Sequence, residues 1–170
     1  MIIQKNGKSD RDFDGIRWVI SVRSKDAKRD NIRSINIDSG VMVGTDGHRL
    51  HLYTPERELK DGTYEVVTDT AKTIVLEPSD VMFPDYERVF PQDTHNGIKP
   101  INTPSDTQRR DNSVLNGVLK QSDLCYNTKY LSEACPCDET LHFLQSEHAL
   151  IIRNSDYSKG AIVMELRIES

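Results

Sequence analysis

The sequence predicts an α+β fold in which short antiparallel strands outnumber the helices. Most of the chain consists of short segments that alternate apolar and polar residues, as half-buried strands do. The order of the expected elements is also repeated, because a strand, a helix and three strands follow one another in each half. We therefore expect one domain over residues 1–170, made of two β-α-β-β-β halves at about 1–77 and 117–170 with a connecting segment at about 78–116.

The N-terminal part of the chain contains an Asp-rich stretch and then an ambiguous segment. Residues 10–15 match the opening of a calcium loop, D-x-D-x-D-G, but Ser21 stands where such a loop requires a bidentate Glu. We therefore interpret the aspartates as the start of a helix, whose positive end they oppose. Residues 11–23 fit either a helix or a strand by their spacing. As a helix, this segment would carry a basic flank, which alone indicates only a solvated surface.

An Asp-Gly pair at positions 46 and 47 predicts a β-hairpin. Alternating residues run up to this pair and away from it, and Asp-Gly favours a tight type I′ turn. A two-residue turn would place Thr45 opposite His48 on a face that we expect to be buried. The opposite face, which we expect to point to water, holds Met42, Gly44, Arg49, His51 and Tyr53.

The remaining elements follow from similar local patterns. Asn127 predicts the start of a short helix over 129–134, which ends before Pro136. β-Branched and apolar residues, bounded by turn residues, predict the other strands at 1–4, 32–37, 63–68, 73–77, 118–124, 141–145, 149–153 and 161–168. Two-to-three-residue turns are expected at 39–40, 147–148 and 158–160.

Two segments predict little regular structure. Prolines at 84 and 91 exclude a helix interior and a central strand, so residues 83–91 are expected to be extended and stiff. Residues 92–116 are rich in Asn, Asp, Thr and Pro, which predicts a mobile insertion or a linker between the halves.

Composition limits the classes of protein that this chain can represent. The 170 residues include 27 acidic and 22 basic ones, for a net charge of −5. That balance argues against a protein that coats nucleic acid with its whole surface, although it permits a local basic stripe. Three cysteines fit a reducing compartment, and no segment has the length of a transmembrane helix or the form of a signal peptide. We expect a cytoplasmic protein without membrane association.

No pattern in the sequence favours catalysis. Nucleophile-elbow, phosphate-loop and zinc-protease motifs are absent. His48 and His51 are expected on opposite faces of the hairpin, which disfavours a shared metal site, and the three cysteines lack the usual zinc spacing. We therefore expect a binding or accessory protein with no enzymatic activity, no cofactor and no metal.

Two motifs resemble those of a known family. Thr-Asp-Gly-His-Arg-Leu at 45–50 resembles a motif of the bacterial DNA polymerase III beta sliding clamps, and Phe-Pro-Asp-Tyr-Glu-Arg-Val-Phe-Pro at 83–91 is similar to another. Residues 126–131 and 162–167 add weaker similarity to a helix start and to the closing strand of the same family. The resemblance covers most of residues 12–168 and implies a DNA-clamp-like domain of paired β-α-β-β-β halves.

The family resemblance also implies two binding surfaces. Clamp domains join into a ring whose helices line a DNA channel and contact phosphates without reading the bases. Here the residues implied to face DNA are Arg17, Lys25, Lys28 and Lys129. The family also binds short hydrophobic peptides in a surface pocket, whose walls here are implied to be Thr45, Gly47, His48, Arg49, Leu50, Pro84, Arg88, Val89, Val163, Met164 and Leu166.

These inferences lead to two hypotheses for the function. The first is a clamp-like processivity factor that tethers DNA without sequence specificity and binds peptides of a DNA polymerase or clamp loader. Because the bacterial clamp has three such domains per subunit and this chain has room for one, that hypothesis requires a homo-oligomer. The second is a non-encircling interaction module, an adaptor or decoy that captures the same peptides without DNA.

Overall fold

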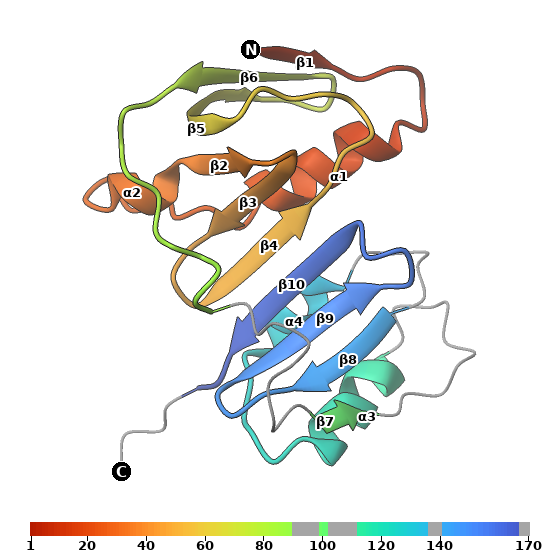
Figure 1. The fold of residues 1–170 in the computed structure, drawn as a ribbon. Coiled ribbons are helices and arrows are strands. Elements are labelled where there is room, and N and C mark those ends of the chain that lie inside the picture. The colour runs from red at the N-terminus through yellow and green to blue at the C-terminus, as the bar shows by residue number, and fades with distance from the viewer. Residues whose placement is uncertain (90–98, 102–111, 136–140, 167–170) are drawn as a thin grey trace. The chain divides into compact units, whose positions relative to one another are not determined.

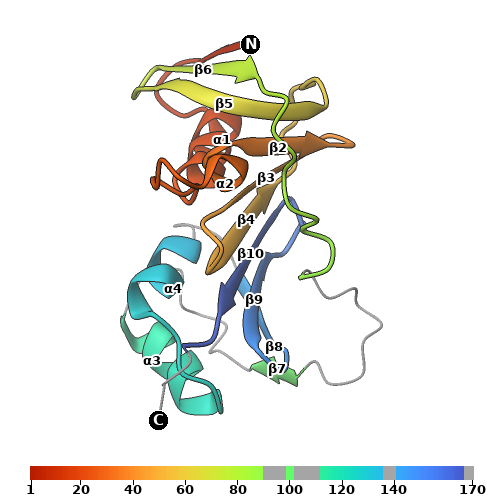
Figure 2. The same cartoon turned by 90° about the vertical axis from the view of Figure 1, so that its left-hand side faces the viewer.

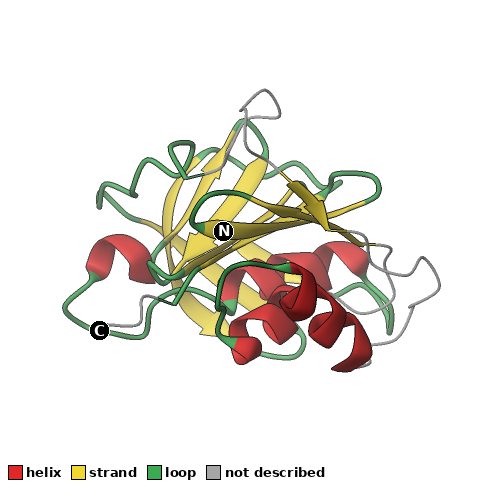
Figure 3. Cartoon of the chain, turned by 90° about the horizontal axis from the view of Figure 1, so that it is seen from below, coloured by secondary structure: helices red, strands yellow, loops and turns green. Residues whose placement is uncertain are grey.

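The computed structural model describes residues 1–89, 99–101, 112–135 and 141–166, and it divides the chain into two compact units, 1–85 and 86–170. Each unit combines an antiparallel sheet with short helices (Figures 1 and 3). The predicted α+β class is confirmed. The boundary between the units lies inside the Phe-Pro-Asp-Tyr motif, between Asp85 and Tyr86.

The first unit contains two helices and six strands. They are β1 Ile2–Gln4, α1 Arg11–Ile20, α2 Asp30–Arg33, β2 Ile35–Asp38, β3 Val41–Thr45, β4 Arg49–Tyr53, β5 Gly62–Asp69 and β6 Thr73–Pro78. The strand order in this unit is β1-β6-β5-β2-β3-β4, and all neighbours are antiparallel. Figure 2 shows α1 on one side of this sheet.

The second unit contains β7 Lys99–Ile101, α3 Asn112–Gln121, α4 Thr128–Ala134, β8 Leu141–Gln145, β9 Ala149–Asn154 and β10 Lys159–Met164. Its strands follow in the order β7-β8-β9-β10, again antiparallel. Each unit thus begins with a strand, two helices and three strands, and the first unit adds the β5–β6 hairpin, which lies between β1 and β2 in the sheet. The internal duplication stays a prediction.

Helix α1 resolves the ambiguity of residues 11–23. Asp10 caps the helix, because its Oδ1 accepts a hydrogen bond from the Phe13 backbone N–H at 2.9 Å. The helix ends at Ile20, so Lys25 and Lys28 lie in the connection that follows it and not on a helical flank with Arg17. The predicted basic flank is therefore wrong.

The core of the first unit lies between α1 and the sheet. Phe13, Ile16, Val19 and Ile20 of the helix are fully buried against strand residues such as Ile35. Strand β3 approaches the helix closely, because a Cβ added to Gly44 would lie 2.6 Å from the Val19 carbonyl oxygen. Glycine is therefore required there by the space between strand and helix.

The predicted hairpin forms, but its register differs from the prediction and both of its faces are largely buried. Thr45 pairs with Leu50, and the central turn residues are Gly47 and His48, not Asp46 and Gly47. The face expected to point to water is the one that α1 covers, so Met42, Gly44, Arg49, His51 and Tyr53 are buried. Val43, Thr45 and Leu50 of the face expected to be buried are buried as well, whereas His48 at its tip is exposed. Alternation separated the two faces but did not predict that α1 covers the second one.

Several other boundaries also required correction. The strand expected at 32–37 begins only at Ile35, because Ile32 belongs to α2. The strand expected at 118–124 is instead the end of α3 and the turn after it. The linker expected at 92–116 includes β7 and the start of α3, while 92–98 and 102–111 lie outside the described residues. The turn before β10 spans Ser155–Ser158, earlier than predicted.

The strand expected at 161–168 is β10, which spans Lys159–Met164, and the segment expected to be extended at 83–91 contains a turn at residues 87–89. Other predictions agree with the structure. The strands expected at 63–68, 73–77, 141–145 and 149–153 are β5, β6, β8 and β9. Asn127 caps α4, since its Oδ1 accepts hydrogen bonds from the backbone N–H groups of Lys129 and Tyr130. Ser39 and Gly40 form the β2–β3 turn with positive φ values of 52° and 79°.

Candidate functional site

The tip of the β3–β4 hairpin is held by its own side chains. The Thr45 hydroxyl donates to the Arg49 carbonyl at 2.7 Å and accepts from the Gly47 N–H at 3.0 Å. The Asp46 carboxylate accepts from the His48 and Arg49 N–H groups and from Arg49 Nε, which lies 3.1 Å away. Thr45 and Arg49 are buried as a result, whereas Gly47 and His48 are exposed.

The loop between α1 and α2 lies against this tip. The Ser24 N–H donates to the Thr45 carbonyl at 3.2 Å, and Arg29 Nη1 donates to the Asp46 carbonyl at 3.3 Å. Gly47 has a φ of 92°, and a Cβ there would lie 2.8 Å from Arg29 Nη2. The guanidinium therefore rests on Gly47, and a larger residue would displace it. No local sequence pattern predicts the role of Arg29, because Arg29 and Asp46 are 17 positions apart in the chain.

The predicted peptide-binding residues are divided between the two units. Leu50 and Val163 are buried, at 4% and 0% exposure, so their side chains support the surface without facing solvent. Val89 and Leu166 are 46% and 49% exposed and are available to a ligand. The first unit supplies Thr45, Gly47, His48, Arg49, Leu50 and Pro84, and the second supplies Arg88, Val89, Val163, Met164 and Leu166. Their assembly into one pocket stays a prediction.

The residues predicted to face DNA differ in charge compensation. Arg17 Nε lies 2.8 Å from Asp69 Oδ1, and Lys129 Nζ lies 4.0 Å from Glu133 Oε1. Lys25 and Lys28 are exposed and form no ion pair in the described part of the chain. Only these two of the four residues present an uncompensated charge.

The Asp-rich stretch before and within α1 forms an ion-pair network with Arg57. Arg57 Nη2 donates to both Asp10 oxygens at 2.9 and 3.0 Å, and its Nε donates to Asp12 Oδ2 at 3.0 Å. The Tyr53 hydroxyl and the Glu56 N–H donate to the other oxygen of Asp12. These donors occupy the carboxylates that a calcium loop would need for its metal, which agrees with the helix-start interpretation.

The pKa values in this network follow from its hydrogen bonds. Burial would raise the pKa of Asp10, but hydrogen bonds from the Asn6 and Phe13 N–H groups and from Arg57 outweigh it and lower the pKa to about 2. The pKa of Asp12 is lowered in the same way against the effect of burial, by the Glu56 N–H, the Tyr53 hydroxyl and Arg57. Burial and the Asp12 carboxylate both raise the pKa of Tyr53.

His51 lies under α1 and not at the surface, contrary to the prediction. Its side chain is completely buried, and burial lowers its pKa to about 3. The imidazole is therefore neutral at physiological pH. In the described residues we find no cluster of three or more His, Cys, Asp or Glu side chains arranged to hold a metal ion.

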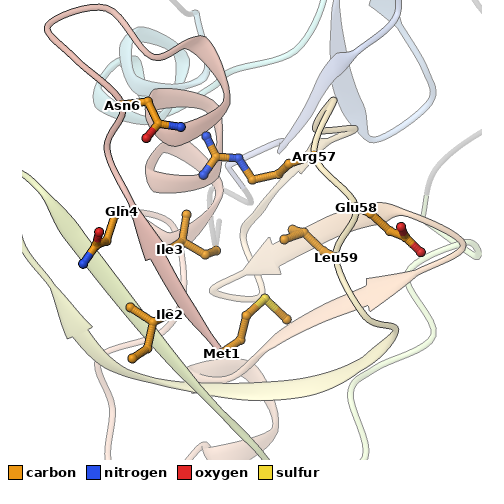
Figure 4. A pocket seen from close by; sticks show the side chains of 8 residues that line it. All are labelled: Met1, Ile2, Ile3, Gln4, Asn6, Arg57, Glu58 and Leu59. Carbon is orange, nitrogen blue, oxygen red and sulfur yellow. The ribbon is translucent and has the colours of Figure 1, made fainter.

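A pocket of about 580 Å³ also lies in the first unit, and Figure 4 shows the side chains around it. None of the predicted site residues contributes to it. Strand β1 and the segment after β4 form its walls, with the lining residues Met1, Ile2, Ile3, Gln4, Asn6, Arg57, Glu58 and Leu59. The Arg57 guanidinium that faces this side is already bound to Asp10 and Asp12.

In the second unit, the end of β10 contacts the start of β9. His148 Nδ1 lies 2.8 Å from Glu165 Oε1, and the Glu165 N–H donates to the His148 carbonyl. Glu165 also bridges to Tyr126, just before α4. These contacts fix the backbone on both sides of Glu165, where the predicted ligand-facing residues Met164 and Leu166 lie.

Comparison with solved structures identifies the fold as that of a DNA sliding clamp. The beta sliding clamp of C. crescentus matches 99% of this chain with a TM-score of 0.60 and 15% identity, over 65% of its own length. DNA polymerase III subunit beta of Borrelia burgdorferi matches 99% of this chain, also with a TM-score of 0.60, at 12% identity and over 65% of its length. The beta clamp of Helicobacter pylori, solved bound to a DNA ligase peptide, matches 98% with a TM-score of 0.58 and 11% identity, over 66% of its length.

More particularly, the chain has the fold of the bacterial DNA polymerase III beta sliding clamps, which confirms the resemblance inferred from the two motifs. It spans about 65% of the length of the clamps it matches. No family model and no curated protein matches the sequence. In the described residues, no helix has the length and apolar character needed to cross a membrane.

Proposed function

We propose that this chain is a cytoplasmic, non-enzymatic sliding-clamp-like accessory protein of DNA replication. It captures short hydrophobic peptides of a polymerase, a clamp loader or a repair protein, and it tethers DNA through phosphate contacts. The observation that supports the proposal most strongly is the coincidence of clamp fold and clamp motifs, with the Thr45–Leu50 motif folded into a self-bonded hairpin tip.

Peptide capture is supported by features of each unit taken separately, the hairpin tip of the first unit and the half-exposed apolar residues of the second. The tip offers a rigid polar edge, because its Thr, Asp and Arg side chains are bonded within the loop. Val89 and Leu166 offer half-exposed apolar surface, which fits a short hydrophobic ligand. The clamp of H. pylori binds a DNA ligase peptide, which makes such a peptide a suitable probe for this chain.

DNA tethering rests on Lys25 and Lys28, the two uncompensated cations among the four predicted residues. Contacts of this kind are electrostatic, read no base and weaken with salt. A clamp ring equivalent to that of the three-domain bacterial clamps requires six copies of this chain, so the processivity function includes a homo-oligomer.

The second candidate is the non-encircling peptide-binding module. The observation that favours it is charge compensation, since Arg17 and Lys129 already pair with acidic side chains and contribute little net charge to a DNA channel. Light scattering over a wide concentration range separates the two candidates. A hexamer supports the ring, whereas a monomer that persists at high concentration excludes self-assembled encirclement and leaves peptide capture.

Peptide capture is tested by fluorescence polarisation with the DNA ligase peptide as the probe. Leu166→Asp should weaken peptide binding by tenfold or more, because a carboxylate would replace an apolar side chain that contacts the peptide. Leu166 is half exposed in the free protein and is therefore accessible to a peptide. Ile2→Asp is the matched control, since Ile2 is 68% exposed and is not among the predicted peptide-binding residues. Equal effects of the two substitutions, or no binding by the wild-type chain, would overturn the proposal.

A further inference from the structure

The pocket in the first unit has an apolar part and a polar end. Ile3, which is buried at 3% exposure, forms the apolar part together with Met1 and Leu59, which pack against the core and stay partly exposed. Figure 4 shows Asn6 and the Arg57 guanidinium together at one end of the pocket and Met1 and Leu59 at the other. The volume of about 580 Å³ and this separation of apolar walls from polar groups are both typical of pockets that bind small molecules.

The polar end offers hydrogen-bonding groups that the described residues do not use. Arg57 donates through Nε to Asp12 and through Nη2 to Asp10, whereas its Nη1 makes no hydrogen bond in the described part of the chain. The Asn6 backbone N–H donates to Asp10 Oδ2 at 2.8 Å, but the Asn6 side-chain amide has no partner among these residues. The network thus holds Arg57 and the Asn6 backbone in place and leaves N–H donors and one amide oxygen beside the pocket.

The charges at this end do not favour an anionic ligand. Arg57 carries one positive charge, and the Asp10 and Asp12 carboxylates that it binds carry two negative charges. Glu58, which also lines the pocket, is exposed, and the Met1 amino group at the other end is bonded to the backbone of β6. An ammonium group is disfavoured as well, because it has only donors and cannot accept a hydrogen bond from Arg57 Nη1. An uncharged head group with both an acceptor and a donor therefore suits the polar end best.

We propose that this pocket binds an uncharged acyl amide, in which an aliphatic chain ends in an amide group. The amide oxygen accepts a hydrogen bond from Arg57 Nη1, the Asn6 side-chain oxygen accepts one from the amide N–H, and the chain displaces water from the apolar part. Each buried methylene group increases the binding constant about fourfold, so the chain supplies most of the affinity. The inference is independent of the proposed function, because none of the predicted peptide-binding or DNA-facing residues lines the pocket.

The test is an NMR titration of the nitrogen-15-labelled chain, residues 1–170, with octanamide at pH 7. The backbone amide signals of Ile3, Asn6 and Leu59 should shift and saturate, with a dissociation constant on the order of 0.1 to 1 mM. Butanamide, which has a shorter chain, should bind at least roughly tenfold more weakly. Octanoate and octylamine, which keep the chain length but carry a charge, should each bind at least about threefold more weakly than octanamide.

Asn6→Ala tests the polar end by itself. Asn6 is exposed and its side chain has no hydrogen-bond partner among the described residues, so the substitution should leave the fold intact, which urea unfolding followed by Trp18 fluorescence checks. The affinity for octanamide should fall about threefold to tenfold, because one hydrogen bond is lost. Asn31→Ala, which removes an exposed Asn side chain from α2, is the matched control and should leave the affinity unchanged.

Three outcomes would overturn the inference. Tighter binding of octanoate or octylamine than of octanamide would show that charge selects the ligand. Signal shifts that do not saturate, or that spread over both units, would show unspecific association. Equal affinities of Asn6→Ala and Asn31→Ala for octanamide would exclude the polar end from the site. None of these outcomes affects peptide capture or DNA tethering, which are measured with other ligands.

Discussion

The imidazole of His51 stacks on the indole of Trp18, with ring centroids 4.0 Å apart and planes 23° from parallel. His51 Nδ1 lies 3.1 Å from the Trp18 carbonyl oxygen, so this nitrogen carries the proton and donates it. Nε2 is buried without a hydrogen-bond partner in the described part of the chain. A charged imidazole would place a second N–H in this apolar position, so the folded state favours the neutral ring.

Acidification should therefore destabilise the first unit. The unfolded chain binds a proton on His51 near its ordinary pKa of 6.5, whereas the folded chain does not until about 3. Stability conferred by the neutral ring is complete above pH 6.5 and falls as the pH decreases, by up to about 1.4 kcal/mol per pH unit. Urea unfolding at several pH values, followed by the fluorescence of Trp18, the only tryptophan in the sequence, measures this slope.

His51→Phe provides the control, because Phe keeps a flat ring against Trp18 and cannot titrate. The slope between about pH 6.5 and pH 4 should be lost in this variant. Below about pH 4, Asp10 and Asp12 add their own acid dependence. Because their pKa values are lowered in the folded state, their protonation decreases the free energy of unfolding of the protein. An unchanged slope in His51→Phe above pH 4 would contradict the assignment.

Arg57→Met should destabilise the first unit by about 3 kcal/mol, because it leaves two carboxylates largely buried without their cation. The side chains of Asp10 and Asp12 are only 6% and 11% exposed. Arg33→Met removes the exposed pairs with Asp30 and Glu65 and should cost less than about 1 kcal/mol. Urea unfolding of both variants checks the difference, and similar losses would show that the Arg57 network is not a buried one.

Gly47→Ala should weaken the hairpin tip and peptide binding together. The positive φ of 92° disfavours any side chain, and the added Cβ would meet Arg29 Nη2. Gly40→Ala is a matched control, since Gly40 has a φ of 79° but no atom within 4 Å of an added Cβ. Both variants should lose about 1 kcal/mol from backbone strain, and only Gly47→Ala should also lose affinity for the DNA ligase peptide. Equal peptide affinity in the two variants would show that the hairpin tip is not part of the peptide-binding site.

Substitution of Lys25 and Lys28 by Gln should reduce the salt dependence of DNA binding. If each lysine contacts one phosphate, the slope of log K against log salt concentration should become shallower by about 1.8. Lys129→Gln should change the slope less, because Lys129 already lies near Glu133. Titration of labelled duplex DNA at several salt concentrations measures both slopes. A larger effect of Lys129→Gln would assign DNA contact to α4 instead of the loop.

Local sequence patterns predicted a substantial part of this fold. Asn127 predicted the start of α4, Ser39 and Gly40 predicted the β2–β3 turn, and alternation predicted β5 and β9. Each of these features depends on residues that are neighbours in the chain, so the sequence contains the necessary information. The two clamp motifs likewise predicted the fold that the solved clamps share.

The amino-acid sequence by itself therefore determined the class of the fold, most of its strands and the two motifs. Only the tertiary structure showed that the hairpin face expected to point to water is buried, because α1 covers His51 and Tyr53. It also brought Arg57 to Asp10 and Arg29 to Gly47, across 47 and 18 positions of the chain respectively. Such contacts depend on how the helix and loops pack on the sheet. The spacing of residues within one segment does not predict that packing.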